Sequence, residues 1–486
     1  MITSNTDIEK LIYDEARLYF PELFYVPEAS AFYEEKSIGH DVLSHICNDF
    51  EALPMFLCEE PPPSPLLAEA QPGCQEMPGI TKIRDDFPIL KETVNGKPLI
   101  WFDNAATTQK PRCVIDRLRY FYEHENSNVH RAAHALARRT TDAYEGARRI
   151  VADFLGAASP DEIIFVRGAT EGINLVASSY GPAAVSEGDE ILISELEHHA
   201  NIVPWQFLCA KTGAKLRYFP VDDSGQVLLS EYKKRLTPRT KIVAFTHVSN
   251  VLGTITPAEE MVRLAHNAGA VVLIDGAQAA AHLSVNVRAL EADFYVFSGH
   301  KIFGPTGIGV LYGKYELLNS LAPYQGGGNM ISSVTLEESR FKESPHKFEA
   351  GTGSIADVIG LGSALRYLSQ IGPNAIAHYE NTLTAYLTEG AQRIPGLTVV
   401  GTAAQKSGIV SFYLNGFDCD EVACHLDREG IAVRAGHHCA QPVLKRFGLD
   451  KIVRASLAVY NTFEEIDSFV SALSRLTKQP CKHYHQ

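Results

Sequence analysis

A lysine directly after an apolar strand is the first pattern in this sequence that could do chemistry. The β-branched and aromatic run 294–298 is followed by Gly299, His300 and Lys301, so we expect the lysine to emerge from a buried strand at a sheet edge. Partial burial would lower the pKa of the amine and free it for Schiff-base formation with a carbonyl compound. A single lysine is more often simply solvated, so its neighbours decide between the two interpretations.

An aspartate ends a second apolar strand, earlier in the chain. The run 271–274 leads directly into Asp275. A carboxylate in this position can cap a helix N-terminus. It can also hold a protonated pyridine nitrogen, which a pyridoxal cofactor needs if it is to take up electrons. If the two strands are neighbours, Asp275 and Lys301 would face one ring.

Small residues follow a third strand, expected over 162–166. The turn after it contains Gly168, Ala169 and Thr170 and leads into a helix expected over 171–179. The free N–H groups and the positive end of a helix N-terminus favour a phosphate group. Many strand-to-helix turns look alike, so this signal gains its weight from the lysine and the aspartate.

Cys439 lies in the glycine-containing loop GHHCA, flanked by two histidines and preceded by an arginine. A free cysteine is most often a buried structural thiol. The basic neighbours favour the thiolate, which would make this cysteine a nucleophile. A third interpretation is a metal site formed by His437, His438, Cys439, His198 and His199. We expect no metal, because adjacent side chains seldom converge on one ion and no second cysteine or carboxylate lies at ligand spacing.

A mostly parallel sheet is needed to bring these side chains together. Apolar runs alternate with helical patterns over 171–179, 201–212 and 257–268; the runs cover 162–166, 190–194, 216–220, 241–246, 271–274 and 294–298. This alternation is typical of a parallel sheet with helices on both faces, which binds ligands at the carboxyl ends of its strands. After about residue 345 the sequence predicts helices and a smaller α+β unit that includes the run 409–414.

The beginning of the chain differs in composition from the rest. Residues 1–80 contain 15 acidic and 3 basic side chains, whereas the remaining residues contain 43 and 41. Seven prolines between residues 54 and 78 predict an extended linker. We therefore expect three parts: an acidic extension over 1–79 that is disordered or serves in docking or targeting, a large cofactor-binding domain over 80–345, and a small C-terminal domain over 346–486 that carries the Cys439 loop.

The overall composition excludes several protein classes. The chain has 486 residues, 45% apolar and 21% charged, which is typical of a globular protein. Its net charge of -14 argues against a nucleic-acid partner. We expect no membrane partner, because no apolar run is long enough to span a bilayer. The first residues also lack the pattern of a secretory signal. Nine irregularly spaced cysteines indicate reduced thiols and a cytoplasmic location.

Ten stretches occur in the order of one enzyme family: DNAATTQKP (103–111), VHRAAH (129–134), FVRGATEGINLVA (165–177), EHHANIVPW (197–205), THVSNVLGT (246–254), DGAQA (275–279), DFYVFSGHKIFGPTGIGVLY (293–312), FEAGT (348–352), VRAGHHCAQP (433–442) and RASLAVYNT (454–462). Over about residues 80–478 the chain resembles the fold-type-I pyridoxal-phosphate enzymes of aminotransferase class V. Within them it resembles the SUF-type cysteine desulfurases and selenocysteine lyases. The resemblance implies an α/β fold with a large, mostly parallel sheet domain and a smaller C-terminal α+β domain.

The resemblance also implies how pyridoxal 5′-phosphate would be bound. Lys301 would form the Schiff base, and Asp275 would partner the pyridine nitrogen. Gln278 would donate to the ring phenolate, and His198 would stack on the ring and help to move protons. The other cofactor contacts would come from Thr170, Ser298, His300 and Asn250, with Thr352 reaching the phosphate of the neighbouring subunit of a homodimer.

For the substrate, the resemblance assigns the α-carboxylate to Arg454 and Asn250 and places His130 and Arg131 in the site. An arginine fork suits a carboxylate. The implied reaction converts L-cysteine to L-alanine and leaves a persulfide on Cys439, from which a sulfur acceptor protein would take the sulfur. The implied setting is sulfur metabolism and iron–sulfur cluster assembly.

Two alternatives remain beside cysteine desulfuration. The nearest is selenocysteine lyase activity, because the same site accepts selenium in place of sulfur. A class V aminotransferase is less consistent with the sequence, since it has no use for a thiol in a GHHCA loop.

The second alternative concerns the extension: relatives with long, proline-containing extensions resemble cargo of encapsulin-type shells. Residues 1–79 would then address an active enzyme to a protein nanocompartment.

Overall fold

The computed structural model describes residues 77, 79–130 and 133–478. All of them belong to one compact unit that spans Gly73–Gln486. Arg131 and nearly all of the expected extension 1–79 lie outside the described residues. Within the described ranges, no helix combines the length and the apolar character that crossing a membrane requires.

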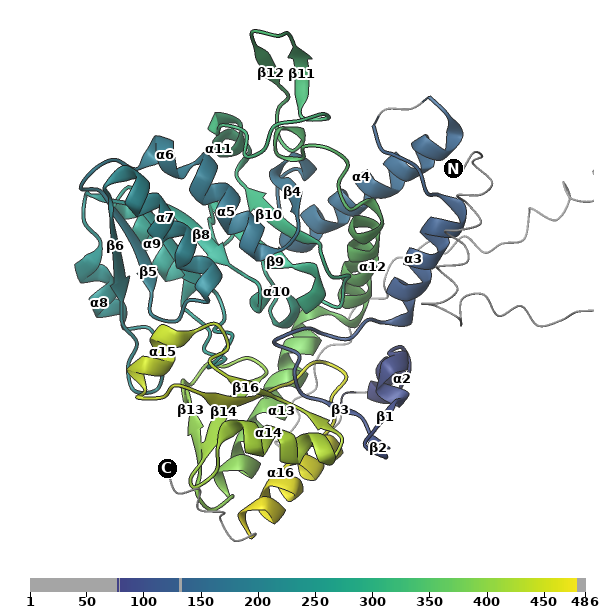
Figure 1. The fold of residues 1–486 in the computed structure, drawn as a ribbon, viewed down its shortest axis with the longest axis vertical. Helices are drawn as coiled ribbons and strands as arrows, with labels where there is room; N and C mark the ends of the chain where they lie inside the picture. The colour runs from purple at the N-terminus through teal and green to yellow at the C-terminus, as the bar shows by residue number, and fades with distance from the viewer. Residues whose placement is uncertain (1–76, 78, 131–132, 479–486) are drawn as a thin grey trace, which may run out of the picture. The chain divides into compact units, whose positions relative to one another are not determined.

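The larger sheet has seven strands in the order β4-β10-β9-β8-β7-β5-β6 (Figure 1). Its strands are β4 (Ile163–Val166), β5 (Glu190–Ser194), β6 (Lys215–Phe219), β7 (Thr240–Thr246), β8 (Val271–Asp275), β9 (Phe294–Ser298) and β10 (Gly309–Gly313). The six expected strands are present to within one residue at either end, and β10 is an additional strand. β10 runs antiparallel to both of its neighbours, whereas all other pairs are parallel. The carboxyl ends of β4, β8 and β9 therefore lie at one edge.

Helices cover both faces of this sheet because successive strand side chains point in opposite directions. On β7, Val243 and Phe245 pack into a core with α4 (Ala135–Leu155), α9 (Ala258–Asn267) and α12 (Ile355–Ile371). Ile242 and Ala244 pack into a second core with α5 (Ala169–Ser179) and α7 (Val203–Thr212). The helix expected over 201–212 is divided: a short 3-10 turn, His199–Asn201, precedes α7.

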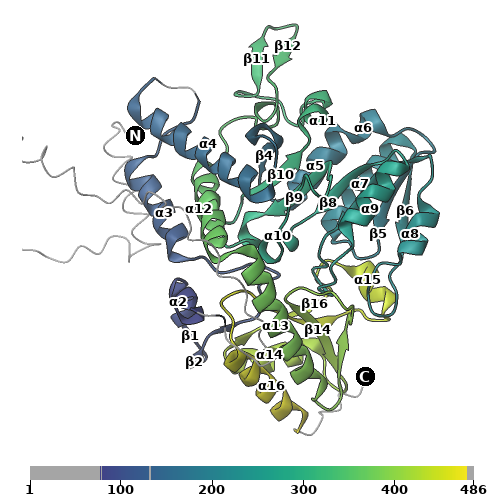
Figure 2. The same ribbon diagram turned by 180° about the vertical axis from the view of Figure 1, so that it is seen from behind.

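A smaller antiparallel sheet lies beside the large one, with the order β13-β14-β17-β16 (Figure 2). Its strands are β13 (Leu397–Val400), β14 (Ile409–Leu414), β16 (Arg434–Gly436) and β17 (Ile452–Ser456), packed with α13 (Pro373–Gln392), α14 (Cys419–Arg428) and α16 (Phe463–Thr477). Ile80 and Phe102 pack into the same core, and β3 (Ile100–Trp101) pairs with β15 (Ile431–Ala432). The segment around residues 80–102 thus packs with the C-terminal part of the chain.

The remaining elements connect these layers. They are α2 (Ile80–Asp85), β1 (Thr93–Val94), β2 (Lys97–Pro98), α3 (Arg112–His124), α6 (Gly181–Ala184), α8 (Leu229–Arg235), α10 (Ala279–His282), α11 (Tyr315–Ser320), β11 (Ile331–Val334), β12 (Ser339–Phe341) and α15 (Gln441–Arg446), with 3-10 turns at Pro88–Lys91, Pro160–Glu162, Gly299–Lys301 and His346–Phe348. The strands β11 and β12 form a hairpin that projects from the rest of the ribbon (Figures 1 and 2).

Candidate active site

Lys301 ends the short turn that follows β9. The backbone before it is tightly held, because the carbonyl oxygen of His300 accepts hydrogen bonds from Thr108 N (3.0 Å), Thr107 Oγ1 (3.0 Å) and Lys110 Nζ (3.1 Å). Burial lowers the pKa of Lys301 to about 8, although the charge of Asp275 opposes the shift. A lysine in this state holds an appreciable fraction of free amine near neutral pH, which Schiff-base chemistry requires.

Asp275 is the last residue of β8, on the strand next to β9, and its side chain is buried. One carboxylate oxygen accepts the N–H of Ala277 at 3.0 Å. Burial raises the pKa of Asp275, while this hydrogen bond and the charge of Lys301 act in the opposite direction. A positively charged group beside the carboxylate would offset the cost of its burial. Close by, Gln278 is anchored through its Nε2, which donates to Ala105 O at 2.8 Å.

The turn from β4 into α5 forms the expected phosphate-type site. The N-cap residue of α5 is Gly168, which has no side chain to cap the first turn. Ser298 Oγ accepts the N–H of Ala169 at 2.9 Å, which joins this turn to the end of β9. The first residue of β10 must be glycine, because a Cβ on Gly309 would collide with Cα of Gly168. This close approach brings Thr170 and the free helix N–H groups to the same edge as Lys301.

His198 lies in the turn after β5 and faces the cavity. Its Nδ1 accepts the N–H of Ala200 at 3.0 Å, which places the proton of the neutral ring on Nε2. Burial, together with the positive charge of Lys301, lowers the pKa of His198 to about 3. The imidazole is therefore neutral near pH 7, with its ring proton on Nε2.

The Cys439 loop is held in an unusual backbone conformation. His438 and Cys439 have φ angles of 51° and 54°, in the left-handed region that side chains disfavour. Contacts from three other segments fix the loop: His199 N donates to Cys439 O (2.7 Å), Asn250 Nδ2 donates to His438 O (2.7 Å), and His438 Nε2 donates to Ile452 O (3.0 Å). The last bond holds the His438 ring against β17.

Arg454 projects from β17 and is 2% exposed. Its Nη1 donates to Asn250 O at 2.9 Å, and its Nη2 pairs with Asp103 at 2.9 Å. Among the described residues, the buried Nε has no partner. Since an unpaired buried donor is costly, this guanidinium has unused capacity for an anionic ligand.

Two charged residues beside Arg454 were not predicted as cofactor or substrate contacts, although one of them, Arg434, is the arginine noted above before the GHHCA loop. Asp103 is its ion-pair partner, and Arg434 lies directly opposite Arg454 on β16 and lines the same cavity. Both belong to motifs quoted above, DNAATTQKP and VRAGHHCAQP. Only the pairing of β16 with β17 and the packing of residue 103 against β17 reveal that the three charges form one cluster.

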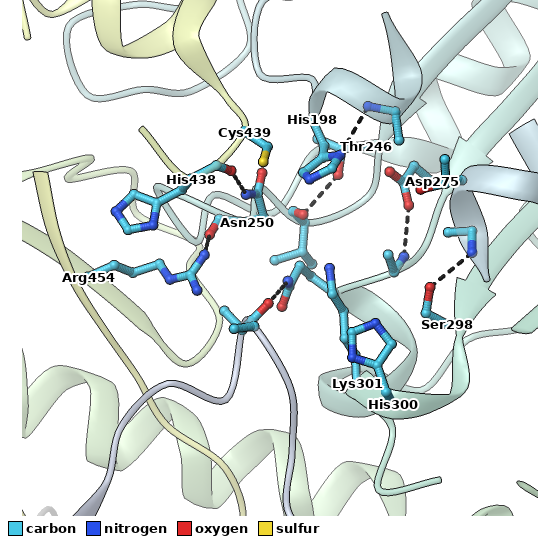
Figure 3. A pocket seen from close by; sticks show the side chains of 18 of the residues that line it. His198, Thr246, Asn250, Asp275, Ser298, His300, Lys301, His438, Cys439 and Arg454 are labelled. Carbon is cyan, nitrogen blue, oxygen red and sulfur yellow. Dashed lines mark hydrogen bonds between the residues drawn. The ribbon is translucent and has the colours of Figure 1, made fainter. Parts of the chain in front are cut away.

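One cavity of about 230 Å³ collects most of the expected site residues (Figure 3). It is lined by Lys301, Asp275, Gln278, His198, Thr170, Ser298, His300, Asn250, Arg454 and Cys439. In Figure 3, Lys301 and Cys439 approach this space from different sides. The lysine and the cysteine, 138 positions apart in the sequence, thus face the same ligand space.

His130 and Thr352 line a different cavity, of about 510 Å³. There, Arg148 pairs with Glu349 of the FEAGT motif (2.7 Å between Nη1 and Oε1), and His130 Nε2 contacts Glu145 Oε1 at 2.8 Å. Within one chain the structure does not bring these two residues to Lys301. Arg131 lies outside the described residues.

The residues of the first cavity fit pyridoxal 5′-phosphate. Lys301 matches its aldehyde, the buried Asp275 matches a protonated ring nitrogen, and the N-terminus of α5 with Ser298 matches its phosphate. The three groups lie at the ends of three strands that share one edge of the sheet. This arrangement defines a pyridoxal-phosphate enzyme of α/β architecture.

Comparison with known proteins places the chain within such enzymes. The model of the aminotransferase class-V family matches residues 100–469, and the chain belongs to this family. Several of its relatives are cysteine desulfurases. The chain is 62% identical over 397 residues to the cysteine desulfurase of Synechococcus elongatus, covering 82% of this chain and 63% of that one. It is 50% identical over 400 residues to the cysteine desulfurase of Klebsiella pneumoniae, covering 82% of this chain and 98% of that one.

A solved structure shares the same fold. The apo structure of the cysteine desulfurase from Thermococcus onnurineus superimposes with a TM-score of 0.79 at 40% sequence identity, covering 82% of this chain and 98% of that one. The expected fold class is therefore confirmed. The chain spans less than two thirds of the length of the Synechococcus relative.

Proposed function

We propose that this protein is a pyridoxal-phosphate-dependent cysteine desulfurase that converts L-cysteine to L-alanine and collects the sulfur on Cys439. The observation that carries the proposal is the shared cavity of Lys301, Asp275 and Cys439. The first two residues suit a carbonyl cofactor with a basic ring nitrogen. The third adds a thiol, for which a transamination would have no use.

The roles of the residues follow from their places in the cavity. Arg454 binds the α-carboxylate of the substrate through its free N–H groups, and Asn250, which contacts both Arg454 and the Cys439 loop, holds the two together. When bound, the cofactor supplies an electron sink for the carbon atoms of the substrate. Lys301, released as a free amine, removes the Cα proton, and the neutral His198 can relay protons.

Sulfur transfer then occurs at Cys439. The thiolate attacks the substrate sulfur, so an S–S bond forms and the Cβ–S bond breaks. The electron pair of that bond stays with carbon. Protonation of the carbon atoms gives L-alanine, and a persulfide remains on Cys439. A sulfur acceptor protein, or a thiol reductant in its absence, must remove the persulfide sulfur.

The second cavity supports a homodimer. Thr352 and His130 lie away from Lys301 within one chain, yet the loop that carries Thr352 is anchored by the buried pair of Glu349 and Arg148. We infer that this loop and Thr352 serve the phosphate site of a second copy. We further propose a cytoplasmic location with reduced thiols, a large and a small domain divided near residue 345, and an addressing role for residues 1–79.

The test is the fate of L-cysteine with two cysteine variants. We expect Cys439→Ser to reduce sulfide release by at least about 10³-fold, while cofactor absorbance is retained, because only the nucleophile is removed. Cys424→Ser is the matched control, since this thiol is exposed on α14. Sulfide and L-alanine should form in equal amounts with the wild type and the control.

Two results would contradict the proposal. Sulfide release that survives in the Cys439→Ser variant would show that another group takes the sulfur. Rapid turnover of L-selenocysteine with negligible turnover of L-cysteine would favour the selenocysteine lyase alternative.

A further inference from the structure

Glu197 is a buried carboxyl group that the proposed reaction does not use. It is 0% exposed and lies in the turn after β5, next to His198. One of its oxygens, Oε1, accepts the hydroxyl of Ser194 and the backbone N–H of Thr246 at 3.0 Å. The other, Oε2, accepts Asn201 Nδ2 at 2.6 Å. Both oxygens are therefore engaged by the protein itself.

The directions of two of these hydrogen bonds are fixed. The N–H of Thr246 is a backbone donor and cannot reverse. The amide of Asn201 cannot reverse either, because Trp205 Nε1 donates to Asn201 Oδ1 at 2.9 Å and leaves only the NH₂ group for Glu197. Each oxygen of Glu197 must consequently accept an N–H. A carboxyl group can do this, whereas an amide of the same shape cannot.

This requirement is independent of the charge on Glu197. Burial raises the pKa of Glu197 to about 8, although hydrogen bonds from Ser194, Asn201 and Thr246 oppose the shift. If the carboxyl group is protonated, the hydroxyl of Ser194 can rotate and accept the proton, and both N–H donors keep their acceptors.

The turn held by Glu197 contacts both the cavity that contains Lys301 and the loop that carries Cys439. Thr246 and His198 line the cavity with Lys301. His199, the next residue, donates its N–H to Cys439 O at 2.7 Å, and its Nε2 accepts the N–H of Gln441 at 3.3 Å. Displacement of Glu197 would therefore move the histidine over the cavity and the support of the Cys439 loop together.

We propose that Glu197 is a positioning residue that sets, through the direction of its hydrogen bonds, where His198 and the Cys439 loop lie relative to Lys301. The kinetic consequence rests on the proposed function, because it concerns sulfur transfer to Cys439. The geometric consequence does not depend on that function.

The experiment reverses one hydrogen bond and then restores it. In Glu197→Gln, an NH₂ group must face either Thr246 N or Asn201 Nδ2, so two donors meet. The double variant Glu197→Gln/Asn201→Asp removes this conflict, since the carboxylate now at position 201 accepts from both Trp205 and the amide at position 197. The double variant has the same number of carboxyl groups as the wild type. Glu195→Gln is the matched control: this side chain belongs to the same turn but accepts from Val221 N, away from the cavity.

We expect kcat of Glu197→Gln for L-cysteine to fall about tenfold to a hundredfold, the effect of a displacement of up to about 1 Å. KM should change by less than about twofold, because Arg454 and Asn250 are held by other elements. Cofactor loading should equal that of the wild type. The double variant should recover kcat to within about threefold. Loss of a residue that serves stability alone would not lower kcat while leaving KM unchanged.

A second measurement, independent of desulfuration, is the rate of alkylation of Cys439 compared with the exposed Cys424. In Glu197→Gln this rate should change by at least about threefold at Cys439 only, and return in the double variant. A wild type that releases no sulfur would defeat the proposed function, but the alkylation rates would still decide the role of Glu197. If Glu197→Gln does not accumulate as folded protein, the double variant decides the question. Its recovery of folding, kcat and the alkylation rate of Cys439 would support the proposal, and its failure to accumulate would overturn it.

Two outcomes would overturn the proposal. The first is a Glu197→Gln variant with unchanged kcat and unchanged alkylation of Cys439. The second is a double variant that remains as impaired as the single one, which would show that hydrogen-bond direction at position 197 is not what matters.

Discussion

The two halves of the active site are built in different ways. Lys301, Asp275 and the phosphate-type turn lie at the ends of buried strands, where the regular sheet decides their positions. Cys439 lies in a loop with two consecutive left-handed residues, held by contacts from distant segments. Regular structure thus fixes the half with Lys301 and Asp275, the cofactor half. The half with Cys439, the loop half, depends on contacts with distant segments that single substitutions can disturb.

The largest expected effect comes from a substitution in the cofactor half. Lys301→Ala should remove the covalent attachment of the cofactor and lower desulfuration by at least about 10⁴-fold, because the attachment point and the base are lost together. After borohydride reduction, mass spectrometry should find cofactor on the peptide with residue 301 in the wild type only.

Lys211→Ala is the control for this experiment, since Lys211 is exposed at the end of α7. If the Lys301→Ala variant still carries reducible cofactor on another lysine, the assignment of the cofactor half is wrong.

The difference between the cofactor half and the loop half explains which site residues the sequence could predict and which it could not. Strand ends follow from local patterns: apolar runs over β4, β8 and β9 lead directly into the turns that carry the cofactor residues. Burial of those runs is sufficient to place their ends at one edge. The expectations for Lys301 and Asp275 therefore needed no knowledge of distant contacts.

The contacts that hold the loop half could not be predicted from any local sequence pattern. The pairing of Arg454 with Asp103 joins residues 351 positions apart, and the bond of Asn250 to His438 joins residues 188 apart. The network of Glu197 likewise depends on the packing of β5 against β7. The family resemblance supplied names for some of these residues, but their partners became visible only in the fold.

The second prediction concerns the pH dependence of stability in the loop half. Burial, and then the charge of Arg454, lowers the pKa of His438 to about 3. In the unfolded chain a histidine takes up its proton near pH 6.5. Between these values the unfolded state binds more protons, so the free energy of unfolding falls as the pH decreases below about 6.5. At pH 5, His438 alone should account for a loss of about 2 kcal/mol.

Urea unfolding at pH 7 and pH 5 measures this loss in the free energy of unfolding. His438→Gln keeps a donor for Ile452 O but cannot titrate, so it should lose less stability than the wild type over this interval. His378→Gln, an exposed position on α13, should behave as the wild type does. Equal losses in the wild type and His438→Gln would mean that His438 is protonated in the folded protein.

The smallest predicted effect comes from adding backbone strain next to the Cys439 loop. Gly436 precedes the GHHCA histidines with a φ angle of 128°, and an added Cβ would meet no atom within 4 Å. Gly436→Ala therefore changes backbone preference without adding a clash, at a cost of about 1–2 kcal/mol. Because the strain lies in the loop half only, kcat for sulfur release should fall severalfold, with cofactor absorbance and attachment to Lys301 unchanged.

Gly326→Ala separates strain from the mere addition of a methyl group. Gly326 also has open space around its Cα, but its φ angle is not in the left-handed region, so this variant should leave both kcat and the midpoint of urea unfolding unchanged. A Gly436→Ala variant with unaltered kcat would show that the Cys439 loop keeps its geometry without the glycine. In that case the contacts from His199, Asn250 and Ile452 alone would be sufficient to hold the loop half, and its expected sensitivity to added backbone strain would be disproved.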